Sequence, residues 1–556
     1  MVTNPLKNLH SADRAVCAGI VLTLCFLSAC SESSSADASG ANAPFPSMGA
    51  GGTGNGSNIA IGGSTSTAGT TALPPEMELD HTFRAPVATG RVLWTSNPDS
   101  GRVALIDAQT LQVRMTNAGF GPTYLAAVPS AAGTDSAIVL NVGSHDASFM
   151  QATSDQDIGV TTIATHTGAN SWSISEDGHF AIAWTDVTQI EGATPDPTDG
   201  FSEVTVIDLT AVPPASTRLS VGFRPSQVVF DAPKLHAYAV VDEGISVLDL
   251  SGEPLVSALI PVTAQGNARD VNISADGSFA VVRVNGSRDV QILDLTSSAG
   301  AEQTLTLESD PTDLDLSPDG KTATAVLGNE APPKVVRFPV PNPGADPANF
   351  VSQVILDDLV RSVTLAPNNQ VALLYANAVP SNDLTLLDTT PGHTTPDGGL
   401  PYRTVDLKGA VEKVYISPDS QTGITFQLPP AGSMEKGLFS IVPTAPGIAR
   451  AAKIVGTDAV PQDVAFSTAA VGKALVTVHD SVSTVHGVYV VGLANLEQNF
   501  VALASEPLPG ATGIVPDVKV GFVAQKHPEG RITFIDLDTG VTQTLTGFEI
   551  AARVVQ

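Results

Sequence analysis

The sequence predicts an all-β domain, a β-propeller of about eight to ten four-stranded blades, over residues 84 to 556. Three observations lead to this prediction: two short motifs recur along the region, their recurrences share one spacing, and apolar residues alternate with polar ones as in strands. A unit of about 40–50 residues that holds four short strands is the sequence form of one propeller blade.

The first motif is an alternating strand that ends in aspartate. Alternation with period two is typical of a strand with one buried face. The clear copies occupy residues 103–107, 204–208, 245–249, 290–294, 384–388 and 532–536. Weaker copies occupy residues 335–339, 439–443 and 488–492, with a less regular one at 160–164.

The second motif is a strand that runs into a tight turn of the Ser-x-Asp-Gly type. Its copies occupy residues 173–178, 272–277 and 315–320, with looser ones at 365–369 and 416–419. The turn residues Asp276, Asp319, Asn368 and Asp419 are 43, 49 and 51 residues apart, and Asp208, Asp249 and Asp294 of the first motif are 41 and 45 apart. Because both motifs have the same period, both belong to one repeating unit.

The number of motif copies, about ten, exceeds the four to eight blades of most propellers. Three arrangements stay open: one large ring, a smaller ring in which 335–339 and 439–443 belong to insertions, or two incomplete rings. We favour one ring because no linker-like tract interrupts residues 90 to 550, and the Pro-rich stretches 331–347 and 391–401 are short enough to be loops. Residues 495–505 are the only candidate helix, and a loop followed by a strand is favoured there.

The repeat phase also predicts how the ring closes. Residues 91–95 occupy an inner-strand position that follows a missing first strand, and the chain ends on the strand-like residues 550–555. We therefore expect the C-terminal strand to pair with residues 91–95 and complete the first blade, which would leave no open edge between the chain ends.

The N-terminus has the pattern of a signal peptide. Lys7 and Arg14 precede an apolar run at 15–26 that is too short to span a bilayer. The run ends in Leu27-Ser28-Ala29-Cys30, which resembles the lipobox of bacterial lipoproteins. The resemblance implies cleavage between Ala29 and Cys30, lipid attachment at Cys30, and a protein held at a membrane of the cell envelope by lipid alone. Because Ser31, not Asp, follows the cysteine, the lipoprotein sorting pattern implies the outer membrane.

Residues 30–83 are predicted to form a flexible linker between the lipid and the propeller. Residues 31–75 contain nine Ser and nine Gly and neither Lys nor Arg. A Gly/Ser-rich coil of this length has a root-mean-square span of about 35–40 Å. The expected domains are thus 1–29 as signal peptide, 30–83 as lipid-anchored linker and 84–556 as propeller.

Charge and cysteine content restrict the partners and cofactors. The chain has 56 acidic and 27 basic residues and a formal net charge of −29, which disfavours nucleic acid and anionic lipid headgroups. Its three cysteines are Cys17 and Cys25, which leave with the signal, and Cys30, which would carry the lipid. The mature domain is therefore expected to form neither a disulfide nor a thiolate metal site.

The repeated motifs resemble the YVTN-type propeller repeats of bacterial surface proteins. In that pattern a V-x-V-I-D strand is followed by a short strand, a Gly-x-x-Pro link and a strand that ends in S-P-D-G. Gly121-Pro122, Gly222 to Pro225 and Asp310-Pro311 occupy the link, and Ser317 to Gly320 match the turn in full. The resemblance covers about residues 90 to 550 and implies the fold; members of the family share no single chemistry, so it assigns no catalytic residue.

Most site motifs have a structural explanation. Residues 315–320 resemble the start of an EF-hand loop, but Val326 stands where a bidentate Glu is needed. Gly320-Lys321-Thr322 lacks the glycine of a phosphate loop five residues earlier, and the chain contains neither Gly-x-Ser-x-Gly nor His-Glu-x-x-His.

Two weaker candidates remain. Asp196 and Asp199 in the acidic loop 191–200 would suit Ca²⁺, although a solvated turn is favoured. The pairs His145-Asp146 and His479-Asp480, together with Glu243, would form a site only if the fold brought them to one channel mouth.

The favoured function is a lipid-anchored, extracytoplasmic binding scaffold. We expect a monomer with a protein or glycan partner, without nucleic acid, and with no catalytic, cofactor or metal-binding residues. An enzyme is the less favoured class: a lactonase-like hydrolase with a metal in the channel. A passive envelope component is the third possibility.

Overall fold

In the computed structural model, the described residues are 84–547 and 553–554, apart from 130–133, 153–156, 188–200, 232–234, 253–254, 263–268, 297–301, 341–351, 397, 447–449 and 528. The chain divides into two units, Met1–Asn58 and Ile59–Gln556, and every strand among the described residues belongs to the second. The expected signal peptide, Cys30, the linker and the acidic loop 191–200 lie outside the described residues.

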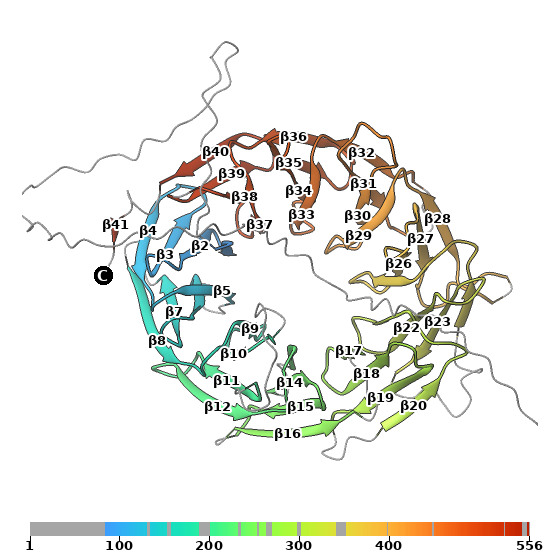
Figure 1. Cartoon of the computed structure of the whole chain (residues 1–556), viewed down its shortest axis with the longest axis horizontal. Helices are drawn as coiled ribbons and strands as arrows, with labels where there is room; N and C mark the ends of the chain where they lie inside the picture. Colours follow the sequence, from blue (N-terminus) through green and yellow to red (C-terminus); the bar gives the residue numbers. More distant parts are fainter. Residues whose placement is uncertain are drawn as a thin grey trace, which may run out of the picture. The chain divides into compact units, whose positions relative to one another are not determined.

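The described part of the chain is all-β, and its strands form ten sheets, each built around four consecutive antiparallel strands. The sheets follow one another around a ring, which identifies a ten-bladed propeller and confirms the predicted fold class (Figure 1). In the ring the blue first blade lies next to the red last blade.

The first five blades span residues 87 to 306. Their strands are, in blade 1, β1 (Val87–Thr89), β2 (Val92–Asn97), β3 (Arg102–Asp107) and β4 (Val113–Asn117); in blade 2, β5 (Pro122–Val128), β6 (Ser136–Asn141), β7 (Asp146–Ala152) and β8 (Ile158–Ala164); in blade 3, β9 (Ser171–Ile174), β10 (Phe180–Trp184), β11 (Glu203–Asp208) and β12 (Ala215–Ser220); in blade 4, β13 (Gln227–Asp231), β14 (His236–Val241), β15 (Gly244–Asp249) and β16 (Val256–Pro261); and in blade 5, β17 (Arg269–Ile273), β18 (Phe279–Val284), β19 (Asp289–Asp294) and β20 (Glu302–Thr306).

The second five blades span residues 313 to 546. Their strands are, in blade 6, β21 (Asp313–Leu316), β22 (Thr322–Leu327), β23 (Lys334–Pro339) and β24 (Ser352–Ile355); in blade 7, β25 (Ser362–Leu365), β26 (Val371–Tyr375), β27 (Asp383–Asp388) and β28 (Tyr402–Asp406); in blade 8, β29 (Ala410–Ile416), β30 (Thr422–Leu428), β31 (Gly437–Pro443) and β32 (Lys453–Thr457); in blade 9, β33 (Val460–Phe466), β34 (Lys473–Asp480), β35 (Val485–Gly492) and β36 (Gln498–Ala502); and in blade 10, β37 (Pro507–Val515), β38 (Val520–Gln525), β39 (Arg531–Asp536) and β40 (Thr542–Thr546).

The hydrophobic core lies between neighbouring blades. One cluster, for example, joins Val281 and Ile292 of blade 5 to Leu314 and Phe338 of blade 6. The second and third strands supply most of the buried residues, because both of their faces are covered by the adjacent blades. Burial of this apolar surface, at about 25 cal/mol per Å², is the main stabilising term of a ring that contains no cysteine among its described residues.

The recurring motifs occupy equivalent places in the blades. The Asp-ended motif is the third strand, and its weak copies at 335–339, 439–443 and 488–492 are the third strands of blades 6, 8 and 9. They are therefore blades and not insertions. The copy expected at 160–164 is wrong: these residues lie in the fourth strand of blade 2, whose third strand is β7. Within 495–505 the structure has strand β36 and no helix, as favoured.

The predicted mode of ring closure is wrong. Residues 87–89 already supply the first strand of blade 1, pairing with β2 through Ala88 and Leu93, so no strand is missing there. The C-terminal β41 (Arg553–Val554) instead pairs in parallel with β4 on the outer side of the blade. The ring closes by side-chain packing, because Leu93 and Ile106 of blade 1 share a core cluster with Phe522 and Phe534 of blade 10.

Candidate functional site

The two faces of the ring are built from different connections. In an antiparallel blade the turns between strands 1 and 2 and between strands 3 and 4 lie at one end of the strands. We call this the turn face. The hairpins between strands 2 and 3, and the links from strand 4 to the next blade, lie at the other end, which we call the link face.

The repeated aspartates stabilise the turn face. Asp249 ends a third strand, and its Oδ1 accepts hydrogen bonds from the Ser251 hydroxyl (2.6 Å) and backbone N–H (2.9 Å), which lower the pKa of Asp249. Asp536 is held in the same way by the backbone and hydroxyl of Thr539. Such bonds fix the turn after the strand and explain why aspartate recurs there.

The Ser-x-Asp-Gly turns are also structural. Ser317 donates from its hydroxyl to Asp319 Oδ1 (2.6 Å) and accepts from the Thr322 N–H (3.0 Å), and Gly320 follows with a φ of 69° that favours glycine. The equivalent turns at Ser175 and Ser274 have the same hydrogen bonds. The repeated residues therefore belong to the scaffold, and a specific site is to be sought at positions that differ between blades.

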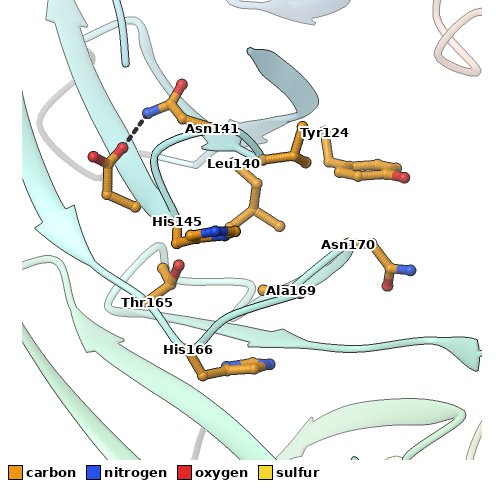
Figure 2. A pocket seen from close by; sticks show the side chains of 11 residues that line it. Tyr124, Leu140, Asn141, His145, Thr165, His166, Ala169 and Asn170 are labelled. Atoms are coloured by element: carbon orange, nitrogen blue, oxygen red, sulfur yellow. Dashed lines mark hydrogen bonds between the residues drawn. The ribbon is translucent and has the colours of Figure 1, made fainter. Parts of the chain in front are cut away.

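A pocket of about 380 Å³ opens on the link face between blades 2 and 3 (Figure 2). Its walls are the hairpin after β6, the link 165–170 between β8 and β9, and Tyr124 of β5. This volume is within the range of small-molecule sites. The rings of Tyr124 and His145 and the side chain of Asn170 surround the space in the figure.

His166 forms a fixed part of this pocket. Its Nδ1 is 2.8 Å from the Thr205 hydroxyl, and its Nε2 is 3.3 Å from the Thr185 hydroxyl. Burial lowers the pKa of His166 to about 4, and nearby Arg218 contributes to the shift. The imidazole is therefore neutral at pH 7, and both of its nitrogens are engaged within blade 3.

Other polar groups of the pocket are also held in place. Asn170 donates to the Asp186 carbonyl (2.9 Å) and accepts from the Asp186 N–H (2.6 Å), and Asn141 donates to Asp146 Oδ1 (2.6 Å). By contrast, the His145 ring and the Tyr124 hydroxyl form no hydrogen bond with the residues that the structure describes. The pocket thus offers one imidazole and one phenol to a ligand, without a nucleophile and base in contact.

The structure does not bring the other histidine–acid residues to this pocket. His145-Asp146, Glu243 and His479-Asp480 all lie in or beside hairpins of the link face, but in blades 2, 4 and 9. His145 and Asp146 border the pocket, whereas the other two are held elsewhere: Glu243 accepts from the Phe223 N–H (2.7 Å), and His479 Nε2 is 2.9 Å from Glu506 Oε1. They form no common site.

Sequence reasoning missed a group of carboxylates on the inner strands. Asp313 and Asp315 of β21 accept hydrogen bonds from the backbone N–H groups of Val363 (2.9 Å) and Leu365 (3.1 Å) on β25. The two carboxylates therefore provide hydrogen-bond acceptors for backbone N–H groups at the free edge of the next blade's first strand. The alternating Asp-Leu-Asp of this strand was the available signal, but it was interpreted only as part of a turn motif.

Burial raises the pKa values of these carboxylates. The pKa of Asp315 is raised to about 7 by burial and by the neighbouring charge of Asp313, whose own pKa burial also raises. Asp270 of β17 lies opposite Arg283 in register, with 3.8 Å between Arg283 Nε and Asp270 Oδ2, and burial raises its pKa as well. Because Asp313 and Asp315 accept backbone N–H groups of the next blade, they act first as a lock between blades 6 and 7, whereas Asp270 forms its ion pair within blade 5.

Within the described residues, no three His, Cys, Asp or Glu side chains are placed to hold one metal ion. The acidic loop with Asp196 and Asp199 lies outside those residues. Across the described part of the chain, no helix has the length and hydropathy to cross a bilayer.

No protein family model matches the chain, and neither does any curated protein sequence. Solved structures with a similar arrangement include hydrazine synthase of Kuenenia stuttgartiensis, at 18% identity over 57% of this chain and 95% of that one, with a TM-score of 0.33. A eukaryotic initiation factor has 14% identity over 78% and 99% of the two chains and a TM-score of 0.48. Apo AztD from Citrobacter koseri has 14% identity over 66% and 94%, with a TM-score of 0.37. Similarity at this level says nothing about a shared activity.

Proposed function

We propose that this ten-bladed propeller is a binding scaffold that acts outside the cytoplasm and presents its link face to a partner. In this proposal the lipid on Cys30 holds the protein at a membrane of the cell envelope. The lipobox pattern Leu27-Ser28-Ala29-Cys30 supports the anchor, and the Ser/Gly-rich residues that follow it support a mobile tether.

One observation carries the proposal: large apolar side chains are exposed on the link face at positions where the scaffold does not need them. Met434 is 96% exposed, Val482 90% and Phe120 72%, and all three lie in hairpins or links of this face. On the turn face the described large apolar residues that are more than half exposed are Val212, at 98%, Val541, at 61%, and Val256 at the start of β16, at 56%. Exposed apolar groups on one face, surrounded by polar residues, are typical of binding surfaces.

The pocket between blades 2 and 3 opens on the same face and adds a concave element to it. Irregular connections on a rigid β-scaffold commonly carry specificity, because they vary without disturbing the core. The turn face has a concavity of its own, of about 480 Å³ between turns of blades 1 and 10, but the repeated Asp and Ser residues of this face are used in turns.

The proposal is tested by crosslinking in intact envelopes, followed by affinity purification of the full-length protein. The triple variant Phe120→Ser/Met434→Ser/Val482→Ser should lose the partner that wild type retains, because it removes apolar contacts without touching the core. The matched control Val212→Ser/Val541→Ser alters exposed valines of the turn face and should retain the partner. Loss of the partner in the control, with retention in the triple variant, would contradict binding through the link face.

A further inference from the structure

Five exposed apolar residues of the link face lie on three consecutive blades. Val379 belongs to the hairpin of blade 7, Leu428 and Met434 to that of blade 8, and Val460 and Val482 to blade 9. Their exposed fractions range from 40% for Val460 to 96% for Met434. We call these five residues the blade 7–9 patch.

The hairpins and links that carry the patch contact one another across the blade boundaries. Asn377 of the blade 7 hairpin donates to the Glu412 carbonyl of blade 8 (3.4 Å). Gly437, at the end of the blade 8 hairpin, lies so close to Pro461 that a side chain would not fit between them. Lys436 of the same hairpin is near enough to Asp480 of blade 9 to help lower the pKa of Asp480, after the Ser483 hydrogen bond.

The surroundings of the patch are strongly acidic. The links and hairpins of blades 7 to 9, with the strand ends that flank them, carry eight acidic residues and three basic ones. The acidic residues are Asp357, Asp358, Asp383, Asp406, Glu435, Asp458, Asp480 and Glu506, and the basic ones are Arg361, Lys408 and Lys436.

Few of the basic charges remain available to balance this surface. Lys408 is paired with Glu435 (2.5 Å), and Lys436 lies near Asp480; Lys526 of blade 10 pairs with Glu506 (3.3 Å), which leaves the other acidic residues of the surface in excess. Carboxylates crowd on blade 7, where burial and the charges of Asp358 and Asp406 raise the pKa of Asp383. A cationic group brought to this surface would relieve repulsion that the folded protein already contains.

We propose that the blade 7–9 patch docks a basic amphipathic segment of a partner protein. The apolar side chains of that segment would cover Met434 and Val482, and its Lys or Arg side chains would face the surrounding carboxylates. Apolar anchors contribute most of the affinity in such interfaces, and complementary charge adds rate and specificity. The inference rests on the proposed binding function and adds the place and the class of partner.

The same charges disfavour a lipid surface as the occupant. An anionic bilayer attracts basic segments and repels a patch surrounded by carboxylates. The exposed apolar residues lie in short hairpins and links of different blades, and no amphipathic helix presents them among the described residues. We therefore argue for a protein segment, and binding to vesicles becomes an outcome that the experiment can reveal.

The probe is a fluorescent synthetic peptide of alternating Leu and Lys, roughly 14 residues long, titrated by anisotropy into the full-length protein in detergent. Met434→Ser/Val482→Ser should weaken its binding at least tenfold, and raising the salt from about 50 to 300 mM should weaken it further. Peptides in which Ser replaces Leu, or Glu replaces Lys, should bind at least tenfold more weakly to wild type. Both substituted residues are exposed, so the melting temperature should be unchanged.

Two controls separate the inference from the proposed function. Val212→Ser/Val541→Ser, on the turn face, should bind the peptide as wild type does. If Phe120→Ser weakens binding and Met434→Ser/Val482→Ser does not, the link face binds elsewhere: the inference is then wrong and the proposed function stands. If only the turn-face control weakens binding, both are wrong. Binding to phosphatidylglycerol vesicles that depends on Met434 and Val482 would replace the protein partner with a membrane.

Discussion

Replacing Asp315 by Asn should stabilise the protein at alkaline pH. Asp315 lies on the inner strand β21, where burial and the charge of Asp313 raise its pKa to about 7. An acid whose pKa is raised on folding binds more protons in the folded state, so stability falls as pH rises from about 4 to about 7. The introduced amide would be neutral at every pH, and its carbonyl oxygen can still accept the Leu365 N–H that Asp315 accepts at 3.1 Å.

The size of the effect follows from the pKa difference. A rise from the ordinary value of 3.8 to about 7 is about three pKa units, each worth about 1.36 kcal/mol, so Asp315→Asn should gain up to about 4 kcal/mol above pH 8. For a domain of about 460 residues the entropy of unfolding is about 1 kcal/mol per kelvin, so this gain corresponds to a rise of up to about 4 °C in melting temperature. At pH 4 the two proteins should melt alike.

The assay is differential scanning calorimetry of the wild type and the variant at pH 4, 6 and 8. Glu176→Gln is the control, since Glu176 is an exposed acid in a turn, and its replacement should change the melting temperature by less than about 1 °C at each pH. An Asp315→Asn protein that melts at or below the wild-type temperature at pH 8 would refute the reasoning, as would a gain that is larger at pH 4 than at pH 8.

Three further predictions follow from the scaffold, the pocket and the anchor. Gly178→Ala should lower the melting temperature by several degrees or prevent folding, because the new Cβ would collide with the Pro129 carbonyl oxygen; Gly286→Ala, also at positive φ but with open space around it, is the matched control. Burial lowers the pKa of His166 to about 4, so its imidazole should stay neutral down to about pH 5 in a titration followed by NMR. The stability of the protein should fall as pH drops from about 6.5 towards 4, because the unfolded state binds a proton there that the folded state does not. Protonation of His166 near pH 6.5 would contradict its buried environment. Cys30→Ser should abolish incorporation of a labelled fatty acid, and equal label in both proteins would show that lipid is attached elsewhere.

The predictions that rested on local sequence pattern and those that rested on contacts between blades had different outcomes. Residues 335–339 and 439–443 were predicted from alternation and spacing, which are properties of the repeating blade. The structure shows that they are the third strands of blades 6 and 8. The prediction for residues 550–555 was wrong because it needed the position of the first strand, and residues 87–89 are too short and irregular a stretch to be recognised as a strand from sequence.

The candidate site also depends on contacts between blades that the sequence pattern did not predict. The pocket joins Tyr124, His145 and Asn170, which belong to different strands and connections of two blades, and no spacing in the sequence predicts that they meet. His145 and His479 look alike in the sequence, since each precedes an aspartate. The fold nevertheless places them on blades 2 and 9, and only His145 borders the pocket.

By itself the sequence determined the all-β class, the blade repeat and the turn chemistry, because alternation, Asp-capped turns and positive-φ glycines act over a few residues. The tertiary structure alone decided that the ring has ten blades, that it closes by packing between blades 1 and 10, and that exposed apolar residues gather on the link face. Those properties depend on which side chains a neighbouring blade covers. Such contacts involve residues about fifty positions apart in the chain, as between Asp315 and the Leu365 N–H, and local pattern does not encode them.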